Sequence, residues 1–142
     1  MKQLIDFQNE WEIIAEKGMA DYGSLTADER VWFNCHTLME QADSGIISFY
    51  YNESAGHVDD TIHDLEKIGF TEPIALLKKI NALFPDGIVP DLEKRNEIIN
   101  SWDSEEYNLM FEEIDDKFYG FKKQFTKKIL DFIMDKGLAY RK

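Results

Sequence analysis

Cysteine is nearly absent from this chain of 142 residues, which has Cys35 as its single one. An intramolecular disulfide is therefore excluded, and this is typical of proteins in a reducing compartment. No apolar run approaches the roughly 18 residues that a membrane span needs. The N-terminal segment carries Asp6, Glu10 and Glu12, where a signal peptide needs an uninterrupted apolar stretch. We therefore expect a cytoplasmic protein that enters no membrane.

Motifs for common catalytic chemistry are also missing. The sequence contains no glycine-rich phosphate loop, no HExxH or GxSxG motif and no CxxC pair. We therefore expect neither a cofactor nor an enzymatic activity. An undescribed hydrolase or metal-dependent enzyme stays an alternative, because catalysis does not require a familiar motif.

Basic residues are scarce and unevenly placed. The formal net charge is −12, but residues 1–119 hold 26 acidic and 9 basic residues, whereas residues 120–142 hold 2 acidic and 7 basic ones. Contacts with DNA or RNA phosphates need lysine and arginine, so direct binding of nucleic acid is not expected. An acidic surface attracts basic partners, although it also serves solubility alone.

Apolar residues recur at spacings of three and four along the chain, which indicates helices. The length is that of one domain. We predict an all-α, compact single domain over residues 1–142 with roughly seven to eight helices. The first is expected over about residues 2–18, and the short apolar segment 46–51 is interpreted as a buried helix because no second strand-like run could pair with it.

Several helix ends carry recognisable signals. Thr26 and Glu29 have the spacing of a capping box, and Gly69 suits the position after a helix. Gly120 is expected to bend or break the last long apolar pattern, which leaves a basic C-terminal helix over residues 121–137. Its lysines could contact a membrane or an acidic partner, or they could complement the acidic body within the fold.

Pairs of adjacent carboxylates are the main candidates for a functional surface. Those near the end of the chain alternate with the apolar residues Tyr107, Phe111 and Ile114, which is typical of the solvated face of an amphipathic helix. A binding surface for a basic protein is the functional interpretation, and general acid–base catalysis is a weaker one. The candidate partner-binding residues are Asp59, Asp60, Glu105, Glu106, Glu112, Glu113, Asp115 and Asp116.

Histidine and cysteine offer little chemistry. His63 lies four residues after Asp59, so the two share a helix face and could begin a metal site, together with His57. Because the spacing indicates no further ligand, we expect no metal, and Asp59 suits the first turn of a helix. Cys35 lies on an apolar stripe and is expected to be a buried, unreactive thiol.

Short features follow one another in a characteristic order along about residues 22–120. They are Leu25-Thr26 with Glu29-Arg30, Gly45, the aromatic run Phe49-Tyr50-Tyr51-Asn52, Gly56, the helical residues Thr61-Ile62 to Ile68-Gly69, Leu83-Phe84-Pro85 and Asp115-Asp116-Lys117-Phe118-Tyr119. In this order they resemble a bacterial family of formerly uncharacterised helical domains that includes a DNA-mimic protein. The resemblance implies an all-helical fold and is compatible with a homodimer. For the DNA-mimic member, it implies acidic side chains placed like phosphates.

Together these observations predict a non-enzymatic acidic protein that binds a basic protein partner. A DNA-binding regulator, occupied by DNA mimicry, is the partner that the resemblance suggests. An immunity or antitoxin-like protein that neutralises a basic effector is the alternative among binding proteins.

Overall fold

The computed structural model describes residues 2–138, and most of them are helical. Within this range there is no strand, apart from an isolated bridge between Pro85 and Gly87. The α-helices are α1 (Gln8–Ala20), α2 (Ala27–Ala42), α3 (Ile46–Tyr50), α4 (Val58–Lys67), α5 (Glu72–Asn81), α6 (Leu92–Asn100) and α7 (Ser104–Asp135). Three short 3-10 helices accompany them: η1 (Leu4–Phe7), η2 (Tyr22–Ser24) and η3 (Glu53–His57). The predicted all-α class is confirmed.

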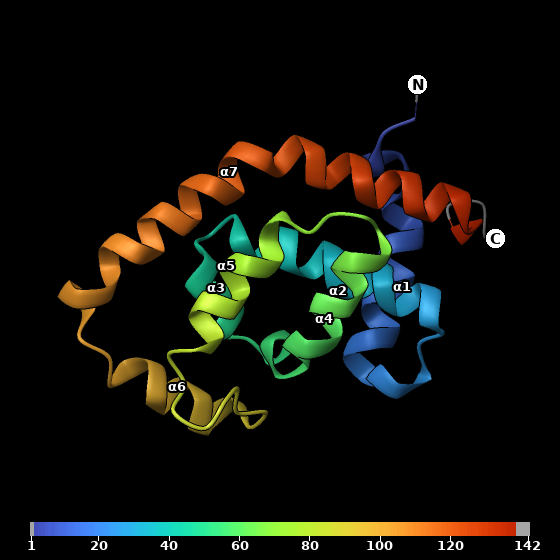
Figure 1. Ribbon diagram of the computed structural model, residues 1–142. Coiled ribbons are helices and arrows are strands. Elements are labelled where there is room, and N and C mark those ends of the chain that lie inside the picture. Colours follow the sequence, from blue (N-terminus) through green and yellow to red (C-terminus); the bar gives the residue numbers. More distant parts are fainter. Residues whose placement is uncertain (1, 139–142) are drawn as a thin grey trace.

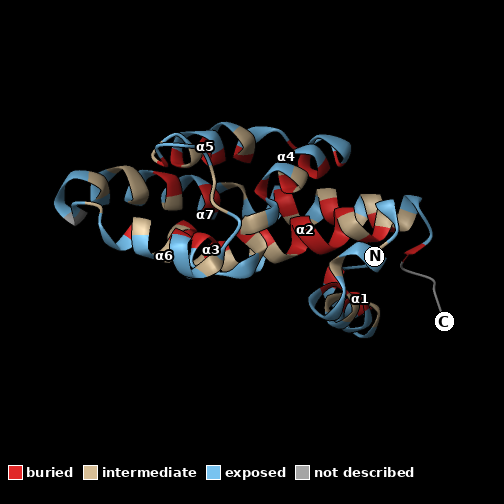
Figure 2. Cartoon of the chain, turned by 90° about the horizontal axis from the view of Figure 1, so that it is seen from below, coloured by how far each residue is buried: buried red, intermediate tan, exposed pale blue. Residues whose placement is uncertain are grey.

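Helix α2 is the centre of the fold. It contacts α1, α3, α4 and α7, and buried positions follow it along its length (Figure 2). Val31, Cys35 and Leu38 are completely buried within one continuous apolar cluster. Burial of such side chains contributes about 25 cal/mol for each Å² of apolar surface removed from water. The predicted burial of Cys35 is thus confirmed, and burial raises the pKa of its thiol well above the usual value, which disfavours the reactive thiolate.

The local signals around α2 and α3 are confirmed. The Glu29 backbone N–H donates to Thr26 Oγ1 at 3.2 Å, and the Thr26 N–H donates to Glu29 Oε1 at 2.9 Å, which completes the capping box. Lys17 on α1 donates to the same Glu29 carboxylate at 2.8 Å and ties the two helices together. The segment expected as a buried helix forms α3, and Gly69 follows α4 with a φ of 72°.

Gly18, where the first helix was expected to end, and Gly120, expected to bend or break a helix, both lie inside helices. Gly18 is within α1, where a Cβ atom would lie 2.5 Å from the ring of Phe33, so close packing requires the absence of a side chain. Gly120 is within α7, which continues from Ser104 to Asp135. The basic segment predicted as a separate helix over 121–137 is therefore the second half of one long helix. Figure 1 shows α7 arched across one side of the molecule.

A buried arginine on α6 holds the loop between α5 and α6. The Arg95 guanidinium is fully buried and donates to the carbonyl oxygens of Tyr50 at 2.9 Å, Val89 at 2.7 Å and Pro90 at 3.2 Å, and also to that of Asn52. These acceptors belong to α3, the turn after it and the loop before α6. Arg95 therefore joins three segments of the chain through hydrogen bonds.

Candidate protein-binding surface

The first half of α7 carries the densest set of predicted carboxylates. The helix begins after Asp103, whose side chain accepts a hydrogen bond from the Glu105 N–H at 3.0 Å. Negative charge in this first turn is favoured by the helix dipole. Ile114 and Phe118 bury the opposite face against the core. The exposed carboxylates on this half of the helix are those of Glu105, Glu106, Glu112, Glu113 and Asp116.

These carboxylates fall into two rows. With about 100° of rotation per residue, Glu105, Glu112 and Asp116 lie within about 40° of one another and form the outer row, which points away from the core. Glu106 and Glu113 form the lateral row, about 90° around the helix. None of the five forms an ion pair with another described residue. Their charge is therefore available to solvent or to a partner.

The spacing of the outer row is comparable with that of DNA phosphates. A rise of about 1.5 Å per residue places Glu105 and Glu112 about 10 Å apart along the axis, and Glu112 and Asp116 about 6 Å apart. Successive phosphates of one DNA strand rise about 3.4 Å along the duplex axis, so the axial components of these gaps equal about three and two phosphate steps, while the phosphates themselves also wind around that axis. A single helix thus presents a row of exposed negative charges at fixed axial intervals.

Two large apolar side chains accompany the outer row. Leu109 is 66% exposed and Tyr119 is 85% exposed, and both lie within about 40° of the row on α7. Exposed single apolar residues are common on protein surfaces. Here they share a face with unpaired carboxylates, so this face offers both charge and apolar contact.

Asp115 has a different position from its neighbour Asp116. Its carboxylate accepts a hydrogen bond from the Ile46 backbone N–H at 2.7 Å, at the first residue of α3. Gly45, with a φ of 102°, turns the chain into that helix. Asp115 therefore acts as a remote cap for α3, and the sequence separation of 69 residues explains why the sequence pattern did not indicate it.

Asp59 and Asp60 belong to another surface. They lie in the first turn of α4, which Figure 1 places on the side of the molecule away from α7. The Tyr22 hydroxyl donates to Asp60 at 2.8 Å, and Arg30 lies 3.7 Å from the same carboxylate, whereas Asp59 is exposed. The structure therefore does not bring the eight predicted carboxylates into one cluster.

A buried polar network beneath Asp60 was not predicted from the sequence. Asp64 is completely buried on α4 and accepts hydrogen bonds from Arg30 at 2.9 and 3.1 Å and from Asn34 at 2.9 Å. The guanidinium and the amide together satisfy a carboxylate that would otherwise be costly to bury. This network joins α2 to α4 through hydrogen bonds, and its geometry indicates a role in holding the two helices together. Nothing in a spacing of 30 or 34 residues signals it.

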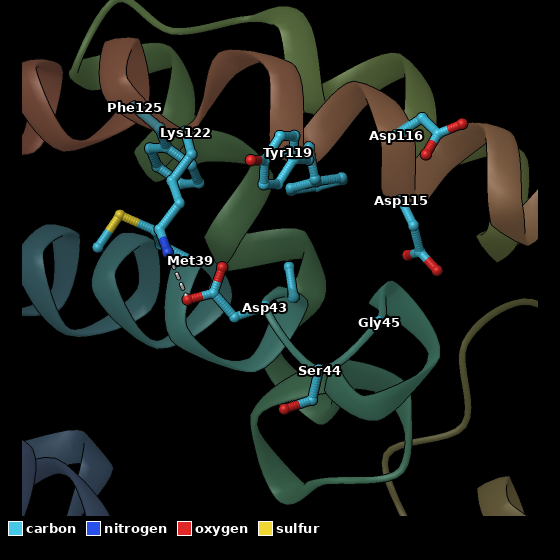
Figure 3. Close-up of a pocket in the computed structure, with 11 residues that line it drawn as sticks. Met39, Asp43, Ser44, Gly45, Asp115, Asp116, Tyr119, Lys122 and Phe125 are labelled. Carbon is cyan, nitrogen blue, oxygen red and sulfur yellow. Dashed lines mark hydrogen bonds and ion pairs between the residues drawn. The ribbon is translucent and has the colours of Figure 1, made fainter.

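A cleft of about 360 Å³ lies beside Asp115 and Asp116 (Figure 3). The junction of α2 and α3 forms one wall and the middle of α7 forms the other. Lys122 donates to Asp43 across the cleft at 2.7 Å, so part of the basic half of α7 does complement the acidic body. The carboxylates of Asp43 and Asp115 both have partners within the cleft, whereas that of Asp116 is exposed.

The histidines do not converge. His57 precedes α4 and stacks on Tyr22 with ring centroids 3.8 Å apart, and His63 is exposed on the same helix. Among residues 2–138, no group of three or more histidine, cysteine, aspartate or glutamate side chains is placed to hold a metal ion. The geometry favours a packing role for His57.

His36 lies in a closed aromatic site beside Cys35. Its ring stacks on Trp11 at 3.9 Å, and its Nδ1 accepts a hydrogen bond from Trp32 Nε1 at 3.1 Å. Nε2 lies 2.7 Å from the Glu40 carboxylate, to which it donates. Burial lowers the pKa of His36 to about 4. The accepting role of Nδ1 requires the same neutral ring, so the contact with Glu40 is a hydrogen bond to a neutral imidazole at pH 7.

Fold and surface together define a small helical protein with an exposed acidic face on one long helix. The family model described as DMP19-like protein matches residues 23–136, about four-fifths of the chain. The chain therefore belongs to the DMP19-like family, which is a family of DNA-mimic proteins. The match confirms the resemblance and extends it into the basic half of α7. Neither the curated proteins nor the solved structures gave a match, and no helix in the described range is long and apolar enough to cross a membrane.

Proposed function

We propose that this protein binds a basic, DNA-binding regulator through the first half of α7 and thereby prevents the regulator from binding DNA. The observation that carries the proposal is the set of exposed, unpaired carboxylates in the outer and lateral rows. Membership of a DNA-mimic family supports it. The proposed activity is binding alone, without catalysis or a cofactor.

The physical basis is charge held on a rigid support. A continuous helix fixes the positions of the carboxylates, so little ordering accompanies binding, and their field speeds encounter with a positively charged surface. Leu109 and Tyr119 add apolar contact of the kind that dominates the energy at the centre of an interface. Charge thus selects the class of partner, and the apolar residues supply part of the affinity.

Displacement from DNA tests this proposal directly. An extract of the native cell is bound to immobilised double-stranded DNA and eluted with the purified protein. The test variant reverses four carboxylates: Glu105→Lys, Glu106→Lys, Glu112→Lys and Glu113→Lys. The control variant makes the same change of charge at exposed positions on other faces: Glu12→Lys, Glu16→Lys, Glu66→Lys and Asp135→Lys. We expect the wild type and the control to elute the same DNA-binding protein, and the test variant to leave it bound.

The association rate supplies the second measurement. For the eluted partner, reversal of the four α7 carboxylates should lower the association rate more than it raises the dissociation rate, because exposed charges mainly steer encounter. Binding should also weaken with added salt, since the Debye length is only about 8 Å at physiological ionic strength. Equal rates for wild type and test variant at low salt, with both helical by circular dichroism, would exclude this face.

Other outcomes distinguish the alternatives. An immunity-like protein would elute nothing from DNA but would bind a basic effector in the same extract. If the control variant and the test variant both fail to elute the DNA-binding protein, binding depends on the net charge of the chain and not on the position of the α7 carboxylates. A cytoplasmic location, expected from the cysteine content, stays a prediction.

A further inference from the structure

An apolar groove lies between the N-terminal segment and the second half of α7. Its volume is about 850 Å³, and Leu4 and Ile5 line one wall, whereas Leu130 and Met134 line the other. Ile5 is 66% exposed, so this apolar surface is open to solvent. Thr126 also lines the groove, but its hydroxyl already donates to a backbone carbonyl oxygen one turn earlier at 2.9 Å. The groove therefore offers mainly apolar contact.

Both walls of the groove are held in place by the fold. The Gln3 backbone N–H donates to the Asp6 carboxylate at 2.8 Å, and the Asp6 N–H donates to the Gln3 carbonyl oxygen at 3.0 Å, which fixes the turn η1. Leu4 and Phe7 of this turn are buried in the core, and Figure 1 shows the segment beside the second half of α7, which it contacts. A groove with fixed walls needs little ordering when it binds a partner.

Two rows of α7 residues follow the groove. The apolar row is Thr126, Leu130 and Met134, and the charged row is Lys123, Lys127 and Asp131. Members of each row are four residues apart, about 6 Å along the axis, and the two rows lie about 60° apart around the helix. An apolar row flanked by a row of charges is the arrangement by which one helix accepts a second helix.

The charged row is open to a partner. All three of its side chains are exposed. Lys123 has no ion pair among the described residues, and the contact between Lys127 and Asp131 at 3.0 Å is an exposed pair of the kind that contributes little. Lys2 lines the opposite wall and is exposed as well. Three lysines and one carboxylate thus border the groove, which favours an occupant that is acidic along most of its length.

We propose that this groove binds an amphipathic helix of another protein. The apolar face of that helix lies on the apolar row, and its flanking residues face the charged row. Two acidic residues, four apart, meet Lys123 and Lys127, and a basic residue four further along meets Asp131. Together the two rows extend over about 16 Å of α7, which is the rise of about three helical turns. The groove lies outside the outer and lateral rows, so this binding goes beyond the proposed function.

The surrounding charge favours a peptide helix over an anionic membrane. Residues 1–119 hold 26 acidic and 9 basic residues, so the body of the chain repels a strongly negative surface. A membrane would also face the Asp131 carboxylate, which a basic residue of a helix can neutralise. The depression between the two walls accepts a protruding row of side chains, as in helix-in-groove recognition.

Synthetic peptides test the charge pattern. The probes are fluorescent helical peptides of about four turns with a leucine face. Beside that face, at intervals of four, one peptide carries the row Glu-Glu-Lys and another carries Lys-Glu-Glu, so that both helix directions are covered. Fluorescence anisotropy with the full chain should show saturable binding of at least one of them. The same peptide with every charge of its row reversed should bind at least about tenfold more weakly, because each facing pair becomes repulsive.

Reversal of the charged row on the protein should reverse this preference. The row-reversed variant combines Lys123→Glu, Lys127→Glu and Asp131→Lys. It keeps opposite charges four residues apart at the last two positions, so the helix loses no support. This variant should bind the reversed peptide about as tightly as the wild type binds the matching one. The control Lys79→Glu makes the same change of net charge at an exposed position of α5 and should keep the wild-type preference.

Nuclear magnetic resonance of methyl groups locates the occupant. The methyl signals of Ile5, Leu130 and Met134 should shift when the matching peptide is added. Leu130→Glu places a charge in the apolar row and should abolish binding, with circular dichroism as the check that the helices are kept. Absence of saturable binding, an unchanged preference in the row-reversed variant, or shifts confined to other residues would each overturn the proposal.

Two further results would assign the groove to a different occupant and would also overturn the proposal. One is retention of the wild type on vesicles of anionic phospholipid that the row-reversed variant loses. The other is a dimer in sedimentation velocity that Leu130→Glu dissociates. The groove variants leave every carboxylate of the outer and lateral rows in place, and no DNA enters these assays. Their outcome is therefore independent of the displacement experiment.

Discussion

Replacement of Arg95 by methionine should remove a large part of the stability of this fold. The methionine stem fills some of the space but donates no hydrogen bond, so the carbonyl oxygens of Tyr50, Asn52, Val89 and Pro90 lose their donor. A hydrogen bond to a charged group contributes about 1.5–3 kcal/mol. Only the Tyr50 carbonyl belongs to a fully buried residue, and the others can regain water. We therefore expect a loss of about 3–5 kcal/mol rather than the sum of four bonds.

Urea unfolding measures this loss against a matched control. With a slope of about 2 kcal/mol per molar urea, the midpoint of the Arg95→Met variant should fall by about 2 M. Lys94→Met removes an exposed charge from the adjacent position of the same helix and should change stability by no more than about 0.5 kcal/mol. Hydrogen exchange should accelerate in the loop over residues 85–91. A loss of less than about 1 kcal/mol for Arg95→Met would refute the structural role assigned to the guanidinium.

Three further predictions follow from single sites. Asp115→Ala removes the remote cap of α3 and should lower the free energy of unfolding, measured in urea, by about 1–2 kcal/mol. Asp116→Ala is the control and should have no measurable effect. Equal effects of the two variants would contradict the capping role. Gly18→Ala places a Cβ atom against the ring of Phe33 and should lower the free energy of unfolding by about 1–3 kcal/mol. Gly120→Ala adds a Cβ atom in open space and should raise the free energy of unfolding by about 0.5–1 kcal/mol. A Gly18→Ala variant as stable as the wild type would be inconsistent with the close packing. The pKa of His36 is about 4 in the folded protein and about 6.5 in the unfolded chain. Between these pH values the unfolded chain therefore binds more protons than the folded protein. The free energy of unfolding should fall as the pH falls from about 6.5 to about 4. The fall should approach about 3 kcal/mol and should be absent from His36→Gln, and parallel stability curves for the two proteins would show that the ring does not titrate as argued.

Features that depend on neighbours in the sequence were predicted from it. The capping box at α2 joins residues three apart, and the glycine after α4 acts on the turn that it follows. The identity of α3 followed from the absence of any second strand-like run. The capping box and the glycine act within a few residues of where they stand in the sequence. The assignment of α3 depended on the composition of the whole chain.

Features that depend on distant residues were not predictable in this way. Arg95 resembles an ordinary charged residue of an amphipathic helix, and only the approach of two loops explains its burial. Asp115 and Asp116 are adjacent and chemically alike, yet only the first one faces α3. Gly120 was expected to bend or break the helix, and an internal glycine costs up to about 1 kcal/mol relative to alanine. Burial of Phe118 and Phe125 on either side outweighs that cost and keeps α7 continuous.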